Sequence, residues 1–406
     1  MSIRTERRWQ TDFAIITAIS FLTYTTNQIL NNSTALYVLS LGSDTSYGGA
    51  LMSIFTIAAL VSRLVCGKMI DNWGARAISL ASAALFAASI LCYLLLANLR
   101  LLFLWRVLQG ISYAALGTAS GAAVAKILPR QAMSRGIFVF GLGQSIALCV
   151  GPFIALSLMN GSDFNRVYCS AAAIIFCAVP LGLLCRYPVR SEPDIPQAAS
   201  DAAGRRPLFR PSDLFEIKTV KPAVVQVLSS MAVSLVVFYM SLFASDKAYA
   251  NAKLFFLIAS VTMILVRVFL SELLARLRNT QVLTLGCLSG MTSFLILITT
   301  HDARLYMASA VFYGVLHATI GPVLQTLSVQ SVPIERRGVA TSSYYLAVDV
   351  GTGIGTALWG VLIDHFGFSA AALTAIVCLS AAILLTFVFF RSSRNRREST
   401  DKEQTA

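Results

Sequence analysis

The sequence predicts an all-α membrane protein of twelve transmembrane helices, arranged as two pseudo-symmetric bundles of six. Three observations indicate this fold class. The 406 residues are 56% hydrophobic and only 13% charged, with a mean hydropathy of +0.72, whereas a soluble domain carries about 25% charged residues. Twelve apolar stretches are long enough to cross a bilayer. Residues of the first half also recur at a fixed offset in the second half.

The predicted spans follow from the thickness of the hydrocarbon core, about 30 Å, which an α-helix crosses in about 20 residues. Lipid offers no partner to backbone polar groups, so only helices and closed barrels can span it, and these stretches lack the two-residue alternation of barrel strands. The predicted spans are residues 13–40, 47–70, 77–97, 101–125, 136–159, 166–186, 222–244, 252–274, 281–299, 304–328, 338–363 and 368–390.

The orientation is predicted from the loops. No convincing small-residue cleavage site follows the first span, so we expect it to be a retained helix and not a signal peptide. An even number of spans places both termini on one side, and most of the 32 Lys and Arg residues fall in the loops and tails of that side. By the positive-inside rule, the sequence predicts a multi-pass protein of the cytoplasmic membrane with both termini in the cytoplasm.

The chain divides into four parts. We expect an N-terminal six-helix bundle at 1–186, a cytoplasmic linker at 187–221, a C-terminal six-helix bundle at 222–390 and a cytoplasmic tail at 391–406, because the linker is rich in proline, charge and small polar residues. A shift of 204 residues matches Arg63 with Arg267 and Gly110 with Gly314 without a gap. Transporters built from such parallel repeats bind substrate near the midplane, between the halves.

Other classes of protein are disfavoured by the same composition. The net charge of +13 is spread over every loop of one side, which is a topology signal and not the compact patch of a nucleic-acid-binding protein. The eight cysteines lack metal-ligand spacing, and the spans contain no nucleophile–base pair or phosphate loop. We expect a monomer with no enzymatic activity, cofactor or metal, whose partners are a small-molecule substrate, protons and the bilayer. A membrane enzyme or a non-transporting sensor is the alternative from another class.

The stretch "GKMIDNWGARA", residues 67–77, gathers charge beside two glycines in a chain that is poor in charge. Through Gly67, Asp71, Gly74 and Arg76 it resembles the loop between the second and third helices of the major facilitator superfamily. In that family the loop holds the two halves together on the cytoplasmic side, so the resemblance implies a conformational latch. An aspartate near a helix end could meet the dipole of a neighbouring helix in one conformation only. A solvated turn is the alternative.

Two further stretches carry the same resemblance. "RVLQGISYAALGTA" resembles a family motif through Arg106, Gln109 and Gly110, which implies that Arg106 takes part in proton transfer; snorkelling of the side chain is the alternative. "GQSIALCVGPFIAL" resembles the antiporter motif through Gly151 and Pro152, although three positions that are usually glycine hold other residues. Small residues and a proline there imply close helix packing. The general resemblance is to drug–proton antiporters and implies proton-coupled efflux, with a proton-coupled importer or a facilitator of a small polar metabolite as the alternative.

The substrate site is sought among polar residues that lipid would reject. In the family, the first, fourth, seventh and tenth spans line the cavity, and in this chain they contain amide, hydroxyl and imidazole groups at mid-membrane depth. The candidate substrate-binding residues are Asn27, Asn31, Thr34, Gln109, Tyr113, Gln226, Ser230, Tyr313 and His317. Hydrogen bonding between helices is the alternative for each of them. The set lacks an obvious pair of opposite charges and favours a neutral or zwitterionic polar substrate.

Asp349 is the only acid near any predicted midplane. It lies twelve residues beyond Arg337, which is about 18 Å along a helix. Burial favours the neutral form of a carboxyl group, so Asp349 could take up and release a proton as the cavity changes sides. We therefore predict that Asp349 and Arg106 carry proton coupling. A structural role of Asp349 against a neighbouring helix is the alternative.

Overall fold

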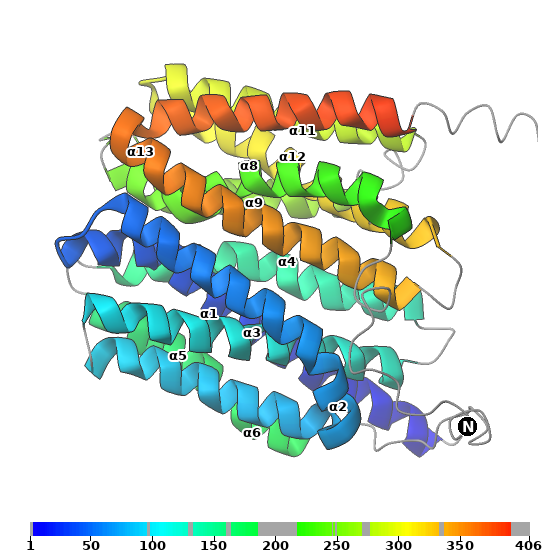
Figure 1. Cartoon of the computed structure of the whole chain (residues 1–406). Coiled ribbons are helices and arrows are strands. Elements are labelled where there is room, and N and C mark those ends of the chain that lie inside the picture. Colours follow the sequence, from blue (N-terminus) through cyan, green and yellow to red (C-terminus); the bar gives the residue numbers. More distant parts are fainter. Residues whose placement is uncertain are drawn as a thin grey trace, which may run out of the picture.

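The described part of a computed structural model comprises residues 3–95, 98–128, 133–159, 164–185, 217–245, 247, 250–269, 277–332 and 337–390. Within it, all regular structure is helical (Figure 1). The elements are α1 (Ile3–Ser40), α2 (Thr45–Leu95), α3 (Leu99–Ile127), α4 (Met133–Leu158), α5 (Asn165–Phe176), α6 (Ala178–Leu184), the short 3₁₀ helix η3 (Ile217–Thr219), α8 (Val220–Ser245), α9 (Ala252–Phe269), α11 (Asn279–Thr299), α12 (Ala303–Gln330) and α13 (Arg337–Phe390).

Twelve membrane crossings are present, as the sequence predicts. Eleven segments of the described chain are long and apolar enough to cross a bilayer, and the last, Ala340–Phe390, has 51 residues, about twice the length of one crossing. A break at Gly367, with φ 78°, divides it in two, and Gly74, with φ 82°, divides α2 in the same way. Both glycines are in a backbone conformation that other residues adopt only with strain.

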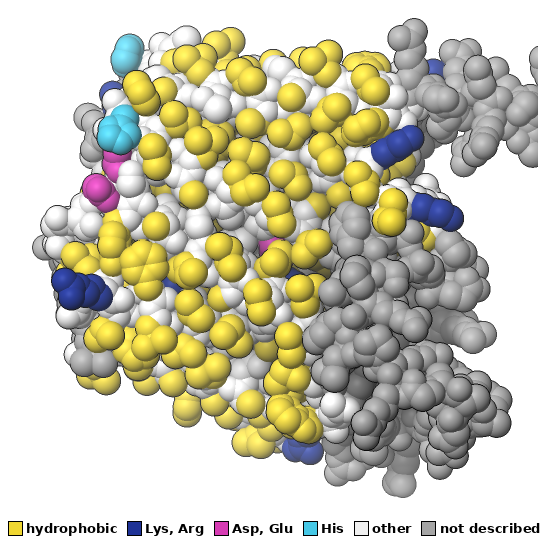
Figure 2. All heavy atoms as spheres, in the orientation of Figure 1, with side chains coloured by type: hydrophobic (Ala, Val, Ile, Leu, Met, Phe, Trp, Pro, Cys, Tyr) yellow, Lys and Arg dark blue, Asp and Glu magenta, His cyan; other side chains and the backbone are white. Residues whose placement is uncertain are grey.

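The outer surface of the helices is suited to lipid. Hydrophobic side chains cover the middle of the face drawn in Figure 2, whereas Lys, Arg, Asp, Glu and His side chains gather toward the two ends. Large apolar groups such as Val377, Leu384 and Val388 are more than 60% exposed, which only an apolar solvent would accommodate over so wide a surface. The two ends are here called the inner side, where α1 begins, and the outer side, where α1 ends.

The two halves share their internal packing. A Cβ added to Gly110 of α3 would lie 2.3 Å from the carbonyl oxygen of Phe55 in α2, and one added to Gly314 of α12 would lie 2.5 Å from that of Ala259 in α9. Each residue of the second pair is 204 positions beyond its counterpart in the first. The sequence repeat therefore corresponds to one helix contact that is made twice, where only glycine allows two helices to approach so closely.

The halves meet along three pairs of helices: α2 with α13, α4 with α9, and α1 with α8. Near the outer side the α2–α13 contact is close, because the space beside Gly49 is filled by the carbonyl oxygen of Thr356 and the hydroxyl of Tyr239. Asp364, just before the Gly367 turn, accepts hydrogen bonds from the backbone N–H groups of Thr45, at 3.0 Å, and Ser46. The first turn of α2 is thus capped by an acid of the other half.

Parts of the predicted organisation lie outside the described residues. These are residues 187–216 of the predicted linker and the whole predicted tail, 391–406. Helix α8 begins at Val220, two residues before the predicted start of the seventh span. The sixth span consists of two helices, α5 and α6, separated at Cys177.

Candidate functional site

A run of buried amides on α1 marks the polar interior. Asn27, Gln28, Asn31 and Asn32 are each less than 8% exposed, and their side-chain oxygens accept no hydrogen bond from the described residues. Leaving such groups in contact with hydrocarbon costs several kcal/mol each, on the order of 2–7. The run therefore faces a polar region between helices and not lipid.

A cavity of about 30 Å³ lies between α1, α4, α8, α9 and α12, so it is lined by both halves. Its polar lining consists of Gln28, Asn32, Ser260, Tyr313 and His317, and apolar side chains such as Met263 and Phe256 complete the wall. This volume has room for about one water molecule, whereas sites for organic ligands occupy about 300–1,000 Å³. The halves pack closely around this cavity.

Two of the predicted substrate residues, Tyr313 and His317, line this cavity, with their rings 6.1 Å apart. The Nδ1 atom of His317 is buried and has no hydrogen-bond partner among the described residues. On α1 the cavity is lined by Gln28 and Asn32, which are four residues apart, and not by Asn27 and Asn31. Asn32 also donates to the carbonyl oxygen of Gln28, at 2.9 Å. Asn27 and Asn31 have the same four-residue spacing, so the sequence alone does not distinguish the two pairs.

The other predicted substrate residues are distributed around the interior. Gln226 donates to the Ser230 hydroxyl at 2.8 Å within α8. Gln109 is fully buried, with both amide atoms unpartnered among the described residues. Tyr113 stands edge-on to Tyr24, with ring centroids 5.6 Å apart. A substrate contact at each of these positions remains a prediction.

Arg106 is fully buried inside the first half. Its guanidinium donates to the Thr34 hydroxyl and, at 3.4 Å, to the carbonyl oxygen of Leu30. It also lies 5.6 Å from the ring of Phe55 and 5.9 Å from that of Tyr93, which are cation–π distances. Thr34 is therefore a partner of Arg106, and this arginine does not snorkel toward the surface.

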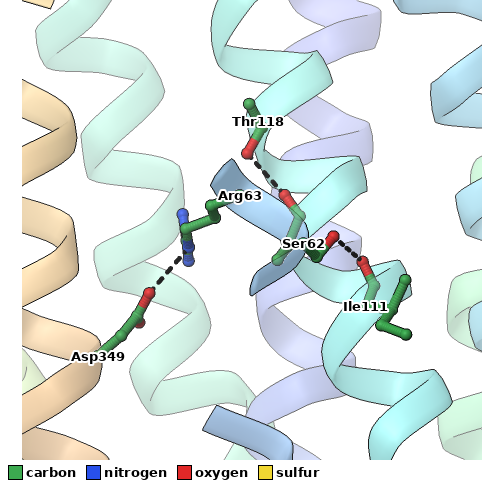
Figure 3. Close-up of polar contacts among 6 residues, drawn as sticks. Ser62, Arg63, Ile111, Thr118 and Asp349 are labelled. Carbon is green, nitrogen blue, oxygen red and sulfur yellow. Dashed lines mark hydrogen bonds and ion pairs between the residues drawn. The ribbon is translucent and has the colours of Figure 1, made fainter. Parts of the chain in front are cut away.

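An ion pair joins the two halves inside the membrane region. The Nε of Arg63 in α2 lies 2.9 Å from a carboxylate oxygen of Asp349 in α13, and Figure 3 shows the two side chains reaching toward each other from different helices. The N–H is not aligned with that oxygen for a hydrogen bond, so the contact is chiefly electrostatic. The side chains are 22% and 15% exposed. The sequence analysis singled out Asp349 but not its partner.

Tyrosines surround this ion pair. The Tyr345 ring lies 5.7 Å from the guanidinium carbon of Arg63. Tyr24 and Tyr113, whose rings pack edge-on, are close enough to interact electrostatically with Arg63. The predicted cavity residue Tyr113 is therefore part of the surroundings of the Arg63–Asp349 pair.

The second half contains a related arginine. Arg267 of α9, which the repeat matches to Arg63, donates to the hydroxyl of Ser145 in α4 and, at 3.4 Å, to the carbonyl oxygen of His317. Each arginine lies in the second crossing of its own half and contacts the fifth crossing of the opposite half. The contact of Arg63 is a carboxylate, whereas that of Arg267 is a neutral hydroxyl.

The predicted latch is described in part. The surroundings of Gly67 and the side chain of Asp71 are not among the described parts of the chain, so the structure gives no partner for Asp71. Gly74 forms the turn between two crossings, and this conformation by itself accounts for a glycine there. Arg76 donates to the carbonyl oxygen of Leu183 at 2.8 Å, within the first half.

The predicted packing residues lie in α4. A Cβ added to Gly151 would lie 2.4 Å from the Gln28 side chain and 2.9 Å from the backbone oxygen of Thr25 in α1. Pro152 lies inside the same helix and lines the cavity. This stretch therefore holds α4 close to the amide run of α1.

Comparisons with known proteins agree with this architecture. The sequence model of the Major Facilitator Superfamily matches residues 16–347 and 282–406. A staphylopine export protein of Staphylococcus aureus is 22% identical over 382 residues, which cover 91% of this chain and 94% of that protein. An uncharacterized MFS-type transporter of Methanocaldococcus jannaschii is 20% identical, over 82% of this chain and 86% of that protein.

Solved structures show the same fold at low sequence identity. A POT family transporter in complex with 5-aminolevulinic acid has a TM-score of 0.75 at 13% identity, over 94% of this chain and 96% of that one. The nucleoside transporter NupG has a TM-score of 0.69 at 16% identity, over 94% of this chain and 98% of that one. With a family match over most of its length and twelve crossings in two related halves, the chain belongs to the major facilitator superfamily of membrane transporters.

Proposed function

We propose that this protein is a proton-coupled exporter that moves a small organic molecule across the cytoplasmic membrane by alternating access, as a monomer with both termini in the cytoplasm. The observation that carries the proposal is the ion pair between Arg63 and Asp349, 2.9 Å apart, which joins the two halves within the membrane region. Such a contact is made when the halves lie together at this depth and is lost when they separate.

The chemistry of the pair suits proton coupling. Proton binding to Asp349 removes the charge that neutralises Arg63 and so removes the attraction between α2 and α13. Breaking one partner of a buried pair typically costs about 3–5 kcal/mol, and the partial exposure of these side chains reduces that figure. An energy of this size is large enough to bias two conformations that differ by a few kcal/mol. Asp349 is therefore assigned as the proton-binding group.

Arg106 has a second part in this proposal. It is a fully buried cation held by Thr34 and two aromatic rings, with no carboxylate partner among the described residues. Its positive charge raises the cost of bringing a proton or another cation into the first half. It thereby separates the proton route along Asp349 from the packed core of that half.

Export is favoured over import by two observations. The staphylopine export protein aligns with 91% of this chain. Gly151 and Pro152 match the antiporter motif, and Gly151 lies at a close contact between α4 and α1. In this proposal the substrate binds among the cavity residues and their neighbours, and the loop with Gly67, Asp71 and Gly74 holds the inner side closed in the opposite conformation.

The test compares cells that make the wild-type chain, Asp349→Asn or, as a matched control, Asp302→Asn, an exposed acid at the start of α12. Untargeted mass spectrometry of cells and medium measures which compounds accumulate outside. We expect the compounds whose export depends on the wild-type chain to disappear from the medium when a protonophore is added. They should also disappear with Asp349→Asn, when the amount of protein in the membrane equals that of the wild type. With Asp302→Asn they should remain in the medium. Export that is insensitive to both would contradict proton coupling, and accumulation inside the cells would contradict the direction.

A further inference from the structure

We propose that the transported molecule carries an anionic group, a carboxylate or a group of similar charge and shape, and that Arg267 together with Ser145 binds it between the halves. This inference rests on the proposed transport function and names the substrate class of the same site. It excludes the neutral substrate and remains compatible with the zwitterionic one that the sequence also favours. The difference arises because Arg267 has no place in the sequence-derived set of candidates.

Among the described residues, the charges of the interior do not balance. The described spans contain three arginines at membrane depth, Arg63, Arg106 and Arg267, and one carboxylate, Asp349. Asp349 neutralises Arg63. Arg106 is enclosed by its hydroxyl, carbonyl and aromatic partners inside the first half. Arg267 is therefore the remaining cation, within the described residues, that lies at the boundary between the halves without a negative partner.

The surroundings of Arg267 are incomplete for a guanidinium. It makes one bond to the Ser145 hydroxyl and a long one, 3.4 Å, to the carbonyl oxygen of His317, whereas its buried Nε–H has no acceptor among the described residues. A guanidinium offers five donors in a planar fork that matches a carboxylate. Burying this charge without a counter-ion is costly, so the arrangement favours an anion at this position.

The cavity lies next to this arginine. His317, whose carbonyl oxygen accepts from Arg267, lines the cavity, as does Met263, which is one helical turn from Arg267 on α9. None of the residues that line the cavity is acidic. When the halves separate at α4 and α9, an anion can therefore approach Arg267 without meeting a like charge.

The pseudo-symmetry of the two halves indicates which group is missing. Arg63 contacts the fifth crossing of the opposite half through the carboxylate of Asp349. Arg267, its counterpart 204 residues later, contacts the fifth crossing of the opposite half through the hydroxyl of Ser145. The protein thus supplies the counter-ion to Arg63 and only a small neutral acceptor to Arg267. At Arg267 the substrate supplies the negative charge.

The decisive test introduces the missing carboxylate. In Ser145→Asp the new acid neutralises Arg267 and competes with the substrate, whereas Ser145→Asn has nearly the same shape and no charge. With the mass-spectrometric export assay, we expect Ser145→Asp to reduce export at least tenfold while the purified protein melts at or above the wild-type temperature. Ser145→Asn changes the same site without adding charge, so we expect it to keep at least about threefold more export than Ser145→Asp. The same level of export in the two variants would overturn the role of Arg267.

Two further measurements complete the test. The exported compounds are identified from their masses, and we expect each to contain a carboxylate, phosphate or sulfonate; neutral or cationic compounds would overturn the inference while leaving proton-coupled transport intact. Arg267→Gln should abolish their export and Arg267→Lys should retain part of it, whereas full export by Arg267→Gln would contradict the proposal. If export instead proves insensitive to a protonophore but requires Arg267, the proposed coupling fails and the anion site stands.

Discussion

The contact between Asp364 and the first turn of α2 should control how readily the outer side opens. The carboxylate accepts the backbone N–H groups of Thr45, at 3.0 Å, and Ser46, and so caps a helix of the opposite half. Loss of such a cap costs about 0.5–2 kcal/mol. We take about 1 kcal/mol because Asp364 is exposed, in the last helical turn before Gly367. Since 1.4 kcal/mol corresponds to a factor of ten, Asp364→Ala should shift the equilibrium toward the outer-open form about fivefold.

The assay is the rate at which a membrane-impermeant maleimide labels a cysteine in the closed interface. Ser53 is suited to this purpose, because its hydroxyl donates to the carbonyl oxygen of Gly353 across the halves at 2.8 Å. In a variant without the eight native cysteines, Ser53→Cys should be labelled about fivefold faster when Asp364→Ala is added. Asp302→Ala is the matched control, because Asp302 caps its own helix α12, at 2.9 Å from the N–H of Arg304. Equal acceleration by both substitutions, or by neither, would refute the reasoning.

The same contact has a defined pH dependence. Partial burial raises the pKa of Asp364, but the N–H groups of Thr45 and Ser46 outweigh this and hold it below the ordinary value of 3.8. A carboxyl group with a lowered pKa stabilises the contact above its ordinary pKa, and that contribution is lost only as pH falls through the lowered value. The contact should therefore persist between about pH 5 and pH 8. Over this range it should cause no change in the rate at which Ser53→Cys is labelled. Faster maleimide labelling on mild acidification would contradict the lowered pKa of Asp364 if the effect persists in Asp349→Asn and is absent in Asp364→Ala.

Three other predictions concern packing, the buried arginine and the latch. Gly110→Ala places a Cβ 2.3 Å from a backbone oxygen and should lower stability by about 1–3 kcal/mol, whereas Gly117→Ala, with open space around it, should be neutral in the same thermal melt. Thr34→Val removes a hydroxyl that accepts a hydrogen bond from Arg106 and should lower stability by about 1–3 kcal/mol. An unchanged melting temperature would show that the neighbouring aromatic rings stabilise the buried arginine without this hydroxyl. Asp71→Ala should slow the turnover of export more than it weakens apparent affinity, and the reverse pattern in flux kinetics would argue against a latch.

The sequence predicts the membrane architecture well because local physics determines it. Apolar length alone defines the crossings, and the spacing of Gly110 and Gly314 identifies a helix contact that each half makes once. Even the division of α2 at Gly74 follows from one residue type, since glycine adopts its positive φ without strain. None of these features depends on which helices from opposite halves meet.

The interior site is harder to predict, because it depends on contacts between halves that are distant in sequence. Asp349 is conspicuous as an isolated acid, but its partner Arg63 lies in α2, and nothing local relates the two. On α1 all the amides of residues 27–32 satisfy the requirement for a polar stripe. Only the packing of α1 against α4 and α8 decides that Gln28 and Asn32 line the cavity. Asp364 resembles an ordinary loop acid until the fold places it over the start of α2.

Movement of the two halves against each other is the central claim, and a distance across the outer side tests it most directly. Ser40→Cys at the end of α1 and His365→Cys beside the Gly367 turn are exposed positions in opposite halves, so spin labels there report their separation by double electron–electron resonance in proteoliposomes. We expect two distance populations whose ratio changes with Asp349→Asn and shifts toward the longer distance with Asp364→Ala. A single distance that is the same in the wild type and both variants would contradict alternating access by these halves.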